Sequence, residues 1–179
     1  LGGALRVQSQ TGPHAHDLVE THSYTGFAAL YADNITATEP GREWDRVLTG
    51  YLNGTRGRPA WGTGEIDYHL DEAGNRIDDI QTVLWARQRS REGVLEALGV
   101  GRSYAVRGGE RALVLEGFSL SSTRATAVSG ERTDVGTEPW RITAVVGQQD
   151  GSREQVHLRL VRGQSDGTVR VVADASGLT

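Results

Sequence analysis

The stretch that decides the fold runs from Arg42 to His69 and reads REWDRVLTGYLNGTRGRPAWGTGEIDYH. Its first half repeats apolar residues at the spacing of one helical face, which predicts an amphipathic helix after Pro40. The second half, Ala60 to Ile66, is a short apolar run bounded by glycines and predicts a strand. The residues on the apolar face of the helix are Trp44, Val47, Leu48, Tyr51 and Leu52.

The segments around this stretch continue the alternation of strands and helices. GFAALYA, residues 26–32, predicts a buried strand before the helix, and TVLWA, residues 82–86, predicts another after it. A second helix is expected to begin after Ser90 as its N-cap and to end before Gly101, with a strand over residues 102–108. This order predicts an α/β layer or barrel, in which ligands collect where strands end.

The remainder of the chain alternates apolar and polar residues, as strands with one buried face do. The turn Gly163 to Gly167 is expected to join the last two strands into a hairpin within a small antiparallel β-sandwich-like domain. With a boundary near Ser119 to Arg124, we divide the chain into an α/β domain, residues 1–120, and a β-rich domain, residues 121–179. Val156, Leu158 and Leu160 are expected on one face of the first hairpin strand, and His157, Arg159 and Val161 on the other.

The composition excludes several kinds of chemistry. The 179 residues include no Lys, Cys or Met, so all 19 basic residues are Arg. Schiff-base lysines, thiol nucleophiles and disulfides are therefore excluded, and any metal must bind to His, Asp or Glu. A net charge of -4 without a basic stripe argues against nucleic acid, and no window is apolar enough for a membrane span. A small-molecule substrate fits best.

The strongest candidate site follows the strand at Ala60 to Ile66. Glu65, Asp67 and His69 occupy alternate positions, so on an extended backbone their side chains leave on the same side. Asp67 and His69 are candidate ligands of a divalent metal, and Glu65 is a third ligand, an orienting group or the catalytic proton carrier. The alternative is a polar strand end that caps a neighbouring helix or pairs with Arg.

A second cluster of histidines lies near the start of the chain, in GPHAHDLVETH. His14, His16 and His22 are candidate metal ligands, and a solvated loop is the alternative reading. Arg102 and Arg107 are candidate substrate-binding groups for an anion. The glycine-rich segment around them follows a helix, whereas a phosphate-binding loop comes directly before one.

Three motifs in this order resemble the C-terminal half of PHP domains, the polymerase and histidinol phosphatase superfamily. They are Trp44-Asp45 on the first helix, Asp67-Tyr68-His69 after the strand, and residues 97–105 at the second helix. The resemblance implies part of a distorted α/β barrel with divalent Zn, Mn or Fe ions, in which Asp67 and His69 are ligands. It also implies hydrolysis of phosphoesters by metal-activated water, with the β-rich tail as an appended domain.

Two departures from this family pattern shape the expectations. Bulky Ile66 and Tyr68 replace small residues of the last family motif, and most of the N-terminal half of the barrel is missing. Because the chain begins without Met, we expect a fragment or processed product, with an upstream segment or a second chain completing the fold. Our leading hypothesis is a metal-dependent hydrolase, and the alternative is a non-catalytic binding or structural module. The β-rich tail slightly favours a location outside the cytoplasm.

Overall fold

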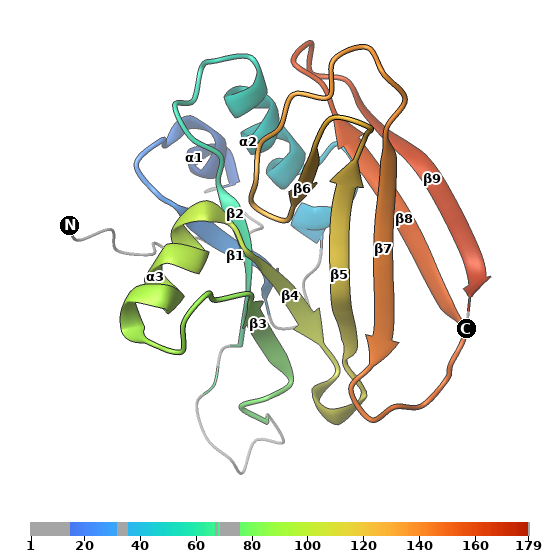
Figure 1. Ribbon diagram of the computed structural model, residues 1–179. Helices are drawn as coiled ribbons and strands as arrows, with labels where there is room; N and C mark the ends of the chain where they lie inside the picture. Colours follow the sequence, from blue (N-terminus) through green and yellow to red (C-terminus); the bar gives the residue numbers. More distant parts are fainter. Residues whose placement is uncertain (1–14, 32–35, 67, 69–75, 179) are drawn as a thin grey trace.

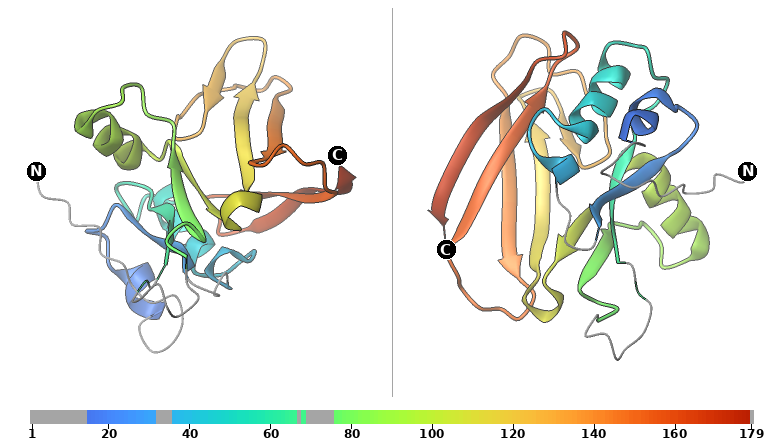
Figure 2. Two further views of the ribbon diagram at one scale, coloured as in Figure 1. Left: turned by 90° about the horizontal axis from the view of Figure 1, so that it is seen from below. Right: turned by 180° about the vertical axis from the view of Figure 1, so that it is seen from behind.

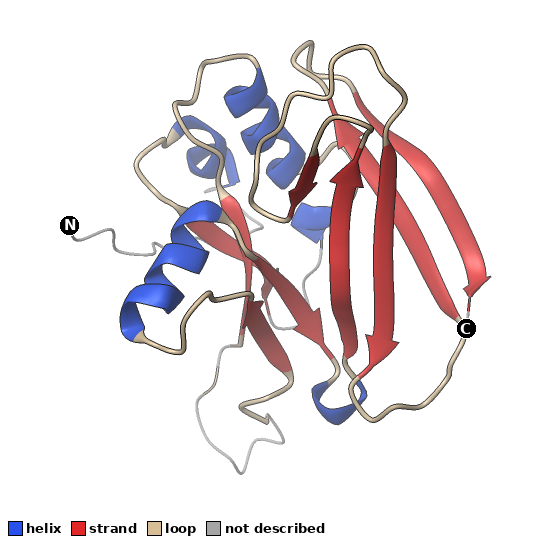
Figure 3. Cartoon of the chain, in the orientation of Figure 1, coloured by secondary structure: helices blue, strands red, loops and turns tan. Residues whose placement is uncertain are grey.

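The fold is that of a computed structural model, which describes residues 15–31, 36–66, 68 and 76–178 (Figure 1). This part of the chain forms three α-helices and four small sheets. The α-helices lie in the half of the molecule that carries the first four strands, and the other half consists of strands and loops with one short 3-10 helix, Gly109–Arg111, at its edge (Figure 3). The helices are α1 (Ala15–Glu20), α2 (Glu43–Leu52) and α3 (Arg91–Val100).

The first two strands form a parallel pair with α2 in the connection between them. In this pair, Gly26 of β1 (Gly26–Tyr31) lies opposite Trp61 of β2 (Trp61–Glu65). The main apolar core packs between β1, α1 and α2, because β1 buries its apolar run and α2 contributes Val47 and Trp44 of its apolar face. Its buried members are Leu18, Tyr24, Phe27, Ala29, Ala37, Val47 and Ala60, with Val19 and Trp44 packed against them.

The next two strands, β3 (Ile80–Leu84) and β4 (Ser103–Arg107), pair in the antiparallel direction, with α3 between them. Side-chain hydrogen bonds connect this pair to β2. The Thr82 hydroxyl lies 2.9 Å from the Gly64 backbone N and 3.0 Å from the Gly64 carbonyl O. Gly64 is required for this approach, because an added Cβ would lie 2.6 Å from the carbonyl O of Gln81.

Helix α3 has the predicted ends. The Ser90 hydroxyl accepts a hydrogen bond from the Gly93 backbone N at 3.1 Å, and Gly101 follows the helix with φ at +76°. These are the N-cap and left-handed C-terminal conformations that the sequence predicts.

Replacing Ser90 with Ala is expected to lower the free energy of unfolding by about 1 kcal/mol, because the Gly93 N–H loses its acceptor. Replacement with Asp should keep most of the stability, since its carboxylate also accepts this bond and interacts favourably with the helix N-terminus. Urea unfolding of the two variants measures both values. A Ser90→Ala variant as stable as the wild type would show that the cap contributes nothing.

The tail forms two antiparallel units. One is a sheet with the strand order β6–β5–β7, and the other is the hairpin of β8 and β9, which confirms the predicted pairing of the last two segments. Within β8, half-buried Val156, Leu158 and Leu160 alternate with exposed neighbours, as predicted. The hairpin lies on the side of the molecule opposite α3 (Figures 1 and 2). The strands are β5 (Leu113–Ser121), β6 (Thr126–Val128), β7 (Arg141–Gln148), β8 (Val156–Gly163) and β9 (Val169–Leu178).

The predicted α/β barrel is wrong. A barrel of this kind needs successive parallel strands, but only β1 and β2 are parallel among the described strands, and no closed barrel forms from them. Because β4 pairs with β3 in the antiparallel direction, the parallel pairing of β1 with β2 is not continued by these strands. Strand β5 runs across residue 120, and the division into residues 1–120 and 121–179 stays a prediction. None of the described helices is long and apolar enough to cross a membrane.

Candidate functional site

The candidate site lies at the carboxyl edge of the parallel pair β1–β2. Because the strands are parallel, both end at this edge, where Tyr31 of β1 lies opposite Glu65 of β2. The carboxyl ends of parallel strands joined through a helix are a common place for ligands, since the connecting segments leave side chains there unpaired. Among the residues that the structure describes, Glu65 is therefore the central residue of the candidate site.

Thr63 holds one oxygen of the Glu65 carboxylate. Its hydroxyl lies 2.8 Å from Glu65 Oε1 and 2.9 Å from the carbonyl O of Phe27, and it has one proton to share between them. Thr63 is buried and Glu65 is half-buried, so the hydroxyl orients the carboxylate from the buried side. In the described part of the chain, Glu65 Oε2 has no hydrogen-bond partner, which leaves it available to a ligand.

The neighbouring strands bring Arg107 to the same edge. Gly64 contacts Thr82 of β3, and Ile80 at the start of β3 lies opposite Arg107 at the end of β4. The exposed Arg107 thus lies toward the same edge as Glu65, and it already takes part in an interaction of its own. Glu65 and Arg107 were predicted as separate candidates, and the strand contacts bring both toward one edge.

An ion pair lies in the segment that leads into β3. Arg76 donates to both carboxylate oxygens of Asp78, at 3.0 and 2.9 Å. These hydrogen bonds lower the pKa of Asp78 below its ordinary value, so its carboxylate stays charged. The Arg76 backbone N also donates to Asp79, which fixes the turn before the strand.

The candidate histidines that the structure describes do not reach Glu65. His16 lies on α1, 3.9 Å from Glu20, and exposed His22 precedes the amino end of β1. Strand β1 separates His22 from the carboxyl edge by about 16 Å, given a rise of about 3.3 Å per residue. His14, Asp67 and His69 lie outside the described residues.

The other candidate arginine, Arg102, has a structural environment. It is buried at the start of β4, and its guanidinium donates to Glu96 of α3 at 2.7 Å. This bond lowers the pKa of Glu96, with a smaller contribution from the charges of Arg102 and Arg87. Arg102 thus connects α3 to β4 and lies away from the carboxyl edge of β1–β2.

The Trp44-Asp45 motif also has structural contacts. The Trp44 indole N–H donates to the carbonyl O of Ala60 at 3.3 Å, and the Gly41 backbone N donates to Asp45 at 2.6 Å. Burial raises the pKa of Asp45, while the bond from Gly41 acts in the opposite direction. The motif therefore positions α2 against β2 and places no group at the carboxyl edge.

A metal ion at the carboxyl edge would need ligands beyond those described. The open Glu65 carboxylate is a suitable oxygen donor, but no group of three His, Cys, Asp or Glu side chains gathers anywhere in the described ranges. Asp67 and His69, which follow in the sequence, have the donor chemistry that Zn, Mn or Fe accepts. Thr63 was not predicted, although its position two residues before Glu65 indicates that both side chains leave the same face of the strand.

The chain was also compared with known proteins. No family model matches it, and no similar protein was found among curated proteins or solved structures.

Proposed function

We propose that the chain is a metal-dependent hydrolase of small phosphoesters, with its reaction centre at the carboxyl edge of β1–β2. The observation that carries the proposal is the open carboxylate of Glu65, which Thr63 orients at the shared end of two parallel strands. The sequence continues from Glu65 with Asp67 and His69, the ligand types that a divalent metal needs.

Each residue of this site has a distinct task. Asp67 and His69 would hold the metal, which would supply Lewis-acid chemistry toward a phosphoryl oxygen and a water molecule. Glu65 accepts the proton of the attacking water, since its Oε2 is open while Thr63 holds Oε1. Arg107 contacts the phosphate and helps to orient it. His16 and His22 are left out of the proposal because they lie toward the other end of β1.

Replacing Glu65 with Gln is expected to lower the rate of hydrolysis about 10²- to 10⁴-fold, because the amide cannot accept the proton. Hydrolysis of bis(4-nitrophenyl) phosphate with added Mn²⁺ measures this rate. Glu154→Gln is the matched control, because Glu154 is exposed in the loop before β8 and should leave the rate unchanged. A Glu65→Gln enzyme as active as the wild type would remove Glu65 from the mechanism.

Metal content tests the ligand assignment separately. Protein purified without chelators or a His-tag is expected to contain stoichiometric Zn, Mn or Fe by plasma mass spectrometry. The double variant Asp67→Ala/His69→Ala should lose this metal, whereas Glu154→Gln should keep it. Wild-type protein that binds no metal and hydrolyses no phosphoester would overturn the hydrolase proposal.

The second candidate function is a non-catalytic binding or structural module. The separation of His16 and His22 from Glu65 favours it, because a polynuclear metal site needs more ligands than the carboxyl edge gathers in the described ranges. Metal content distinguishes the two functions, since a module without a complete ligand set retains no stoichiometric metal.

A further inference from the structure

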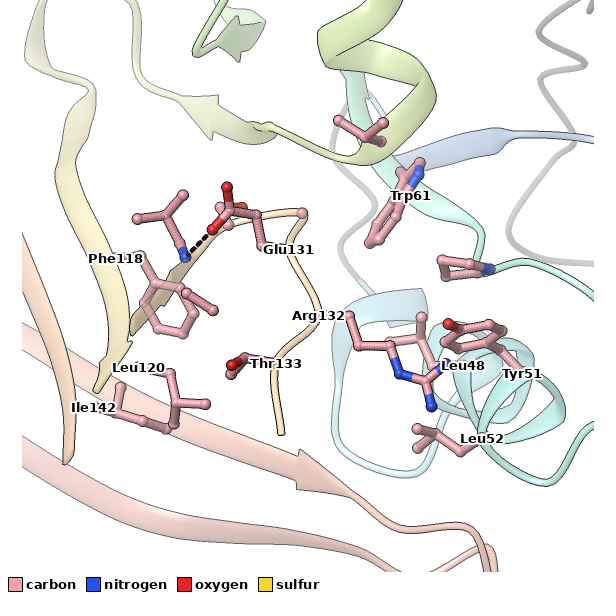
Figure 4. A pocket seen from close by; sticks show the side chains of 16 residues that line it. Leu48, Tyr51, Leu52, Trp61, Phe118, Leu120, Glu131, Arg132, Thr133 and Ile142 are labelled. Atoms are coloured by element: carbon pink, nitrogen blue, oxygen red, sulfur yellow. Dashed lines mark hydrogen bonds between the residues drawn. The ribbon is translucent and has the colours of Figure 1, made fainter. Parts of the chain in front are cut away.

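A pocket of about 860 Å³ lies between helix α2 and the β6–β5–β7 sheet (Figure 4). Trp61, the first residue of β2, lines it, so the pocket is at the opposite end of this strand from Glu65. The volume is within the range of pockets that hold drug-sized molecules. The large side chains of its walls are mainly apolar, and they include Leu48, Leu52, Trp61, Phe118, Leu120 and Ile142.

Two charged residues line this pocket, and they differ in how they are held. Glu131 accepts a hydrogen bond from the Val128 backbone N at 3.0 Å, which keeps its carboxylate on the β6 side. The Arg132 side chain extends from the same loop toward α2 (Figure 4). Within the described part of the chain, neither the Arg132 guanidinium nor the Tyr51 hydroxyl has a partner.

We propose that this pocket binds a small amphipathic carboxylate, a molecule with an apolar aliphatic or aromatic body and one carboxylate group. The body would replace water over the apolar walls, which is favourable in proportion to the area covered. The carboxylate would pair with Arg132, because a guanidinium binds a carboxylate through two parallel hydrogen bonds. Tyr51, on the α2 side of the pocket, offers a further hydroxyl donor.

The charges also select the type of head group and its direction. Glu131 repels an anion from the β6 side, so the carboxylate is directed toward α2 and Arg132. A doubly charged phosphate would carry more charge than the single guanidinium balances, and Glu131 would repel it more strongly. One negative charge on an apolar body therefore matches the pocket better than a polyanion.

The test uses isothermal titration calorimetry with three probes. Decanoate and 2-naphthylacetate carry the carboxylate, and 2-naphthylacetamide is the neutral analogue of the second. Wild-type protein is expected to bind both carboxylates saturably. Replacing Arg132 with Gln should weaken them about 10-fold while the affinity for the amide stays the same, because only the charge-assisted contact is lost.

Two further variants show whether the probes occupy this pocket. Leu52 is 44% exposed, so Leu52→Glu should fold, and its carboxylate would compete for Arg132 inside the pocket. It should abolish binding of both carboxylates. Arg153→Gln, at an exposed position outside the pocket, should change nothing. Thermal unfolding of each variant verifies that it is folded.

Three results would overturn the proposal. They are the absence of saturable binding for both carboxylates, an equal loss of affinity for the amide in Arg132→Gln, and unchanged binding in Leu52→Glu. If neither carboxylate bound saturably, a polypeptide segment would remain as the alternative occupant of the pocket. None of these results depends on hydrolysis at Glu65, so this proposal and the proposed function can fail independently.

Discussion

Replacing Arg56 with Ala is expected to lower the free energy of unfolding by about 3 kcal/mol. Arg56 is 2% exposed, and its guanidinium donates to the carbonyl oxygens of Thr21 at 2.9 Å and Arg58 at 3.1 Å. It also lies 4.3 Å from the centre of the Tyr24 ring, above the main apolar core. Truncation leaves these carbonyls without their donor and opens a cavity beneath the loop that leads to β2.

The effect of Arg56→Ala can be measured by urea unfolding against a matched control. Arg58, two residues along the chain, is exposed and donates a single hydrogen bond to the carbonyl O of Ser23 at 2.9 Å. Arg58→Ala should therefore cost less than about 1 kcal/mol. If the two variants were equally stable, the buried guanidinium would contribute no more than an exposed one, and its role in anchoring the loop would be refuted.

Replacing Gly101 with Ala is expected to lower the free energy of unfolding by about 2 to 4 kcal/mol. Gly101 ends α3 with φ at +76°, a conformation that is strained for a residue with a Cβ. An added Cβ would also lie 2.3 Å from the Trp61 ring, so the indole or the helix end must move. Backbone strain and overpacking therefore act together at this position.

Gly99→Ala is the control for this substitution. Gly99 is in the last turn of α3, exposed, and an added Cβ would meet nothing within 4 Å. Alanine there should stabilise the helix by about 0.5 to 1 kcal/mol, since it restricts the unfolded chain and favours the helix. Thermal unfolding compares the two variants. A Gly101→Ala protein as stable as the wild type would show that the Trp61 ring moves aside without cost.

The local elements of this fold were predictable, whereas their arrangement was not. The periodicity of α2, the Ser90 cap and the alternation along β8 each depend on neighbouring residues, so the sequence indicates them directly. The direction in which β3 and β4 pair depends on tertiary packing. Neither five-residue strand shows the alternation of apolar and polar residues that marks an antiparallel pair, and the predicted barrel was wrong for this reason.

The candidate sites show the same division. Alternation along one strand predicts that Glu65, Asp67 and His69 leave the same side, but it gives no sign that His16 and His22 lie toward the other end of β1. The pocket between α2 and the sheet was not predicted, because Tyr51 and Arg132 are far apart in the sequence. Arg56 was missed because the glycine-rich segment around it is typical of an exposed turn.

The parallel pairing of β1 with β2 has a consequence for how fast the chain folds. The ends of β8 and β9 are joined by a tight turn from Gln164 to Thr168, so this hairpin can form through local contacts within microseconds. Pairing Gly26 with Trp61 instead requires the closure of a long loop that includes α2. We therefore expect the edge that carries Glu65 to assemble late during folding, after the local hairpin of the tail.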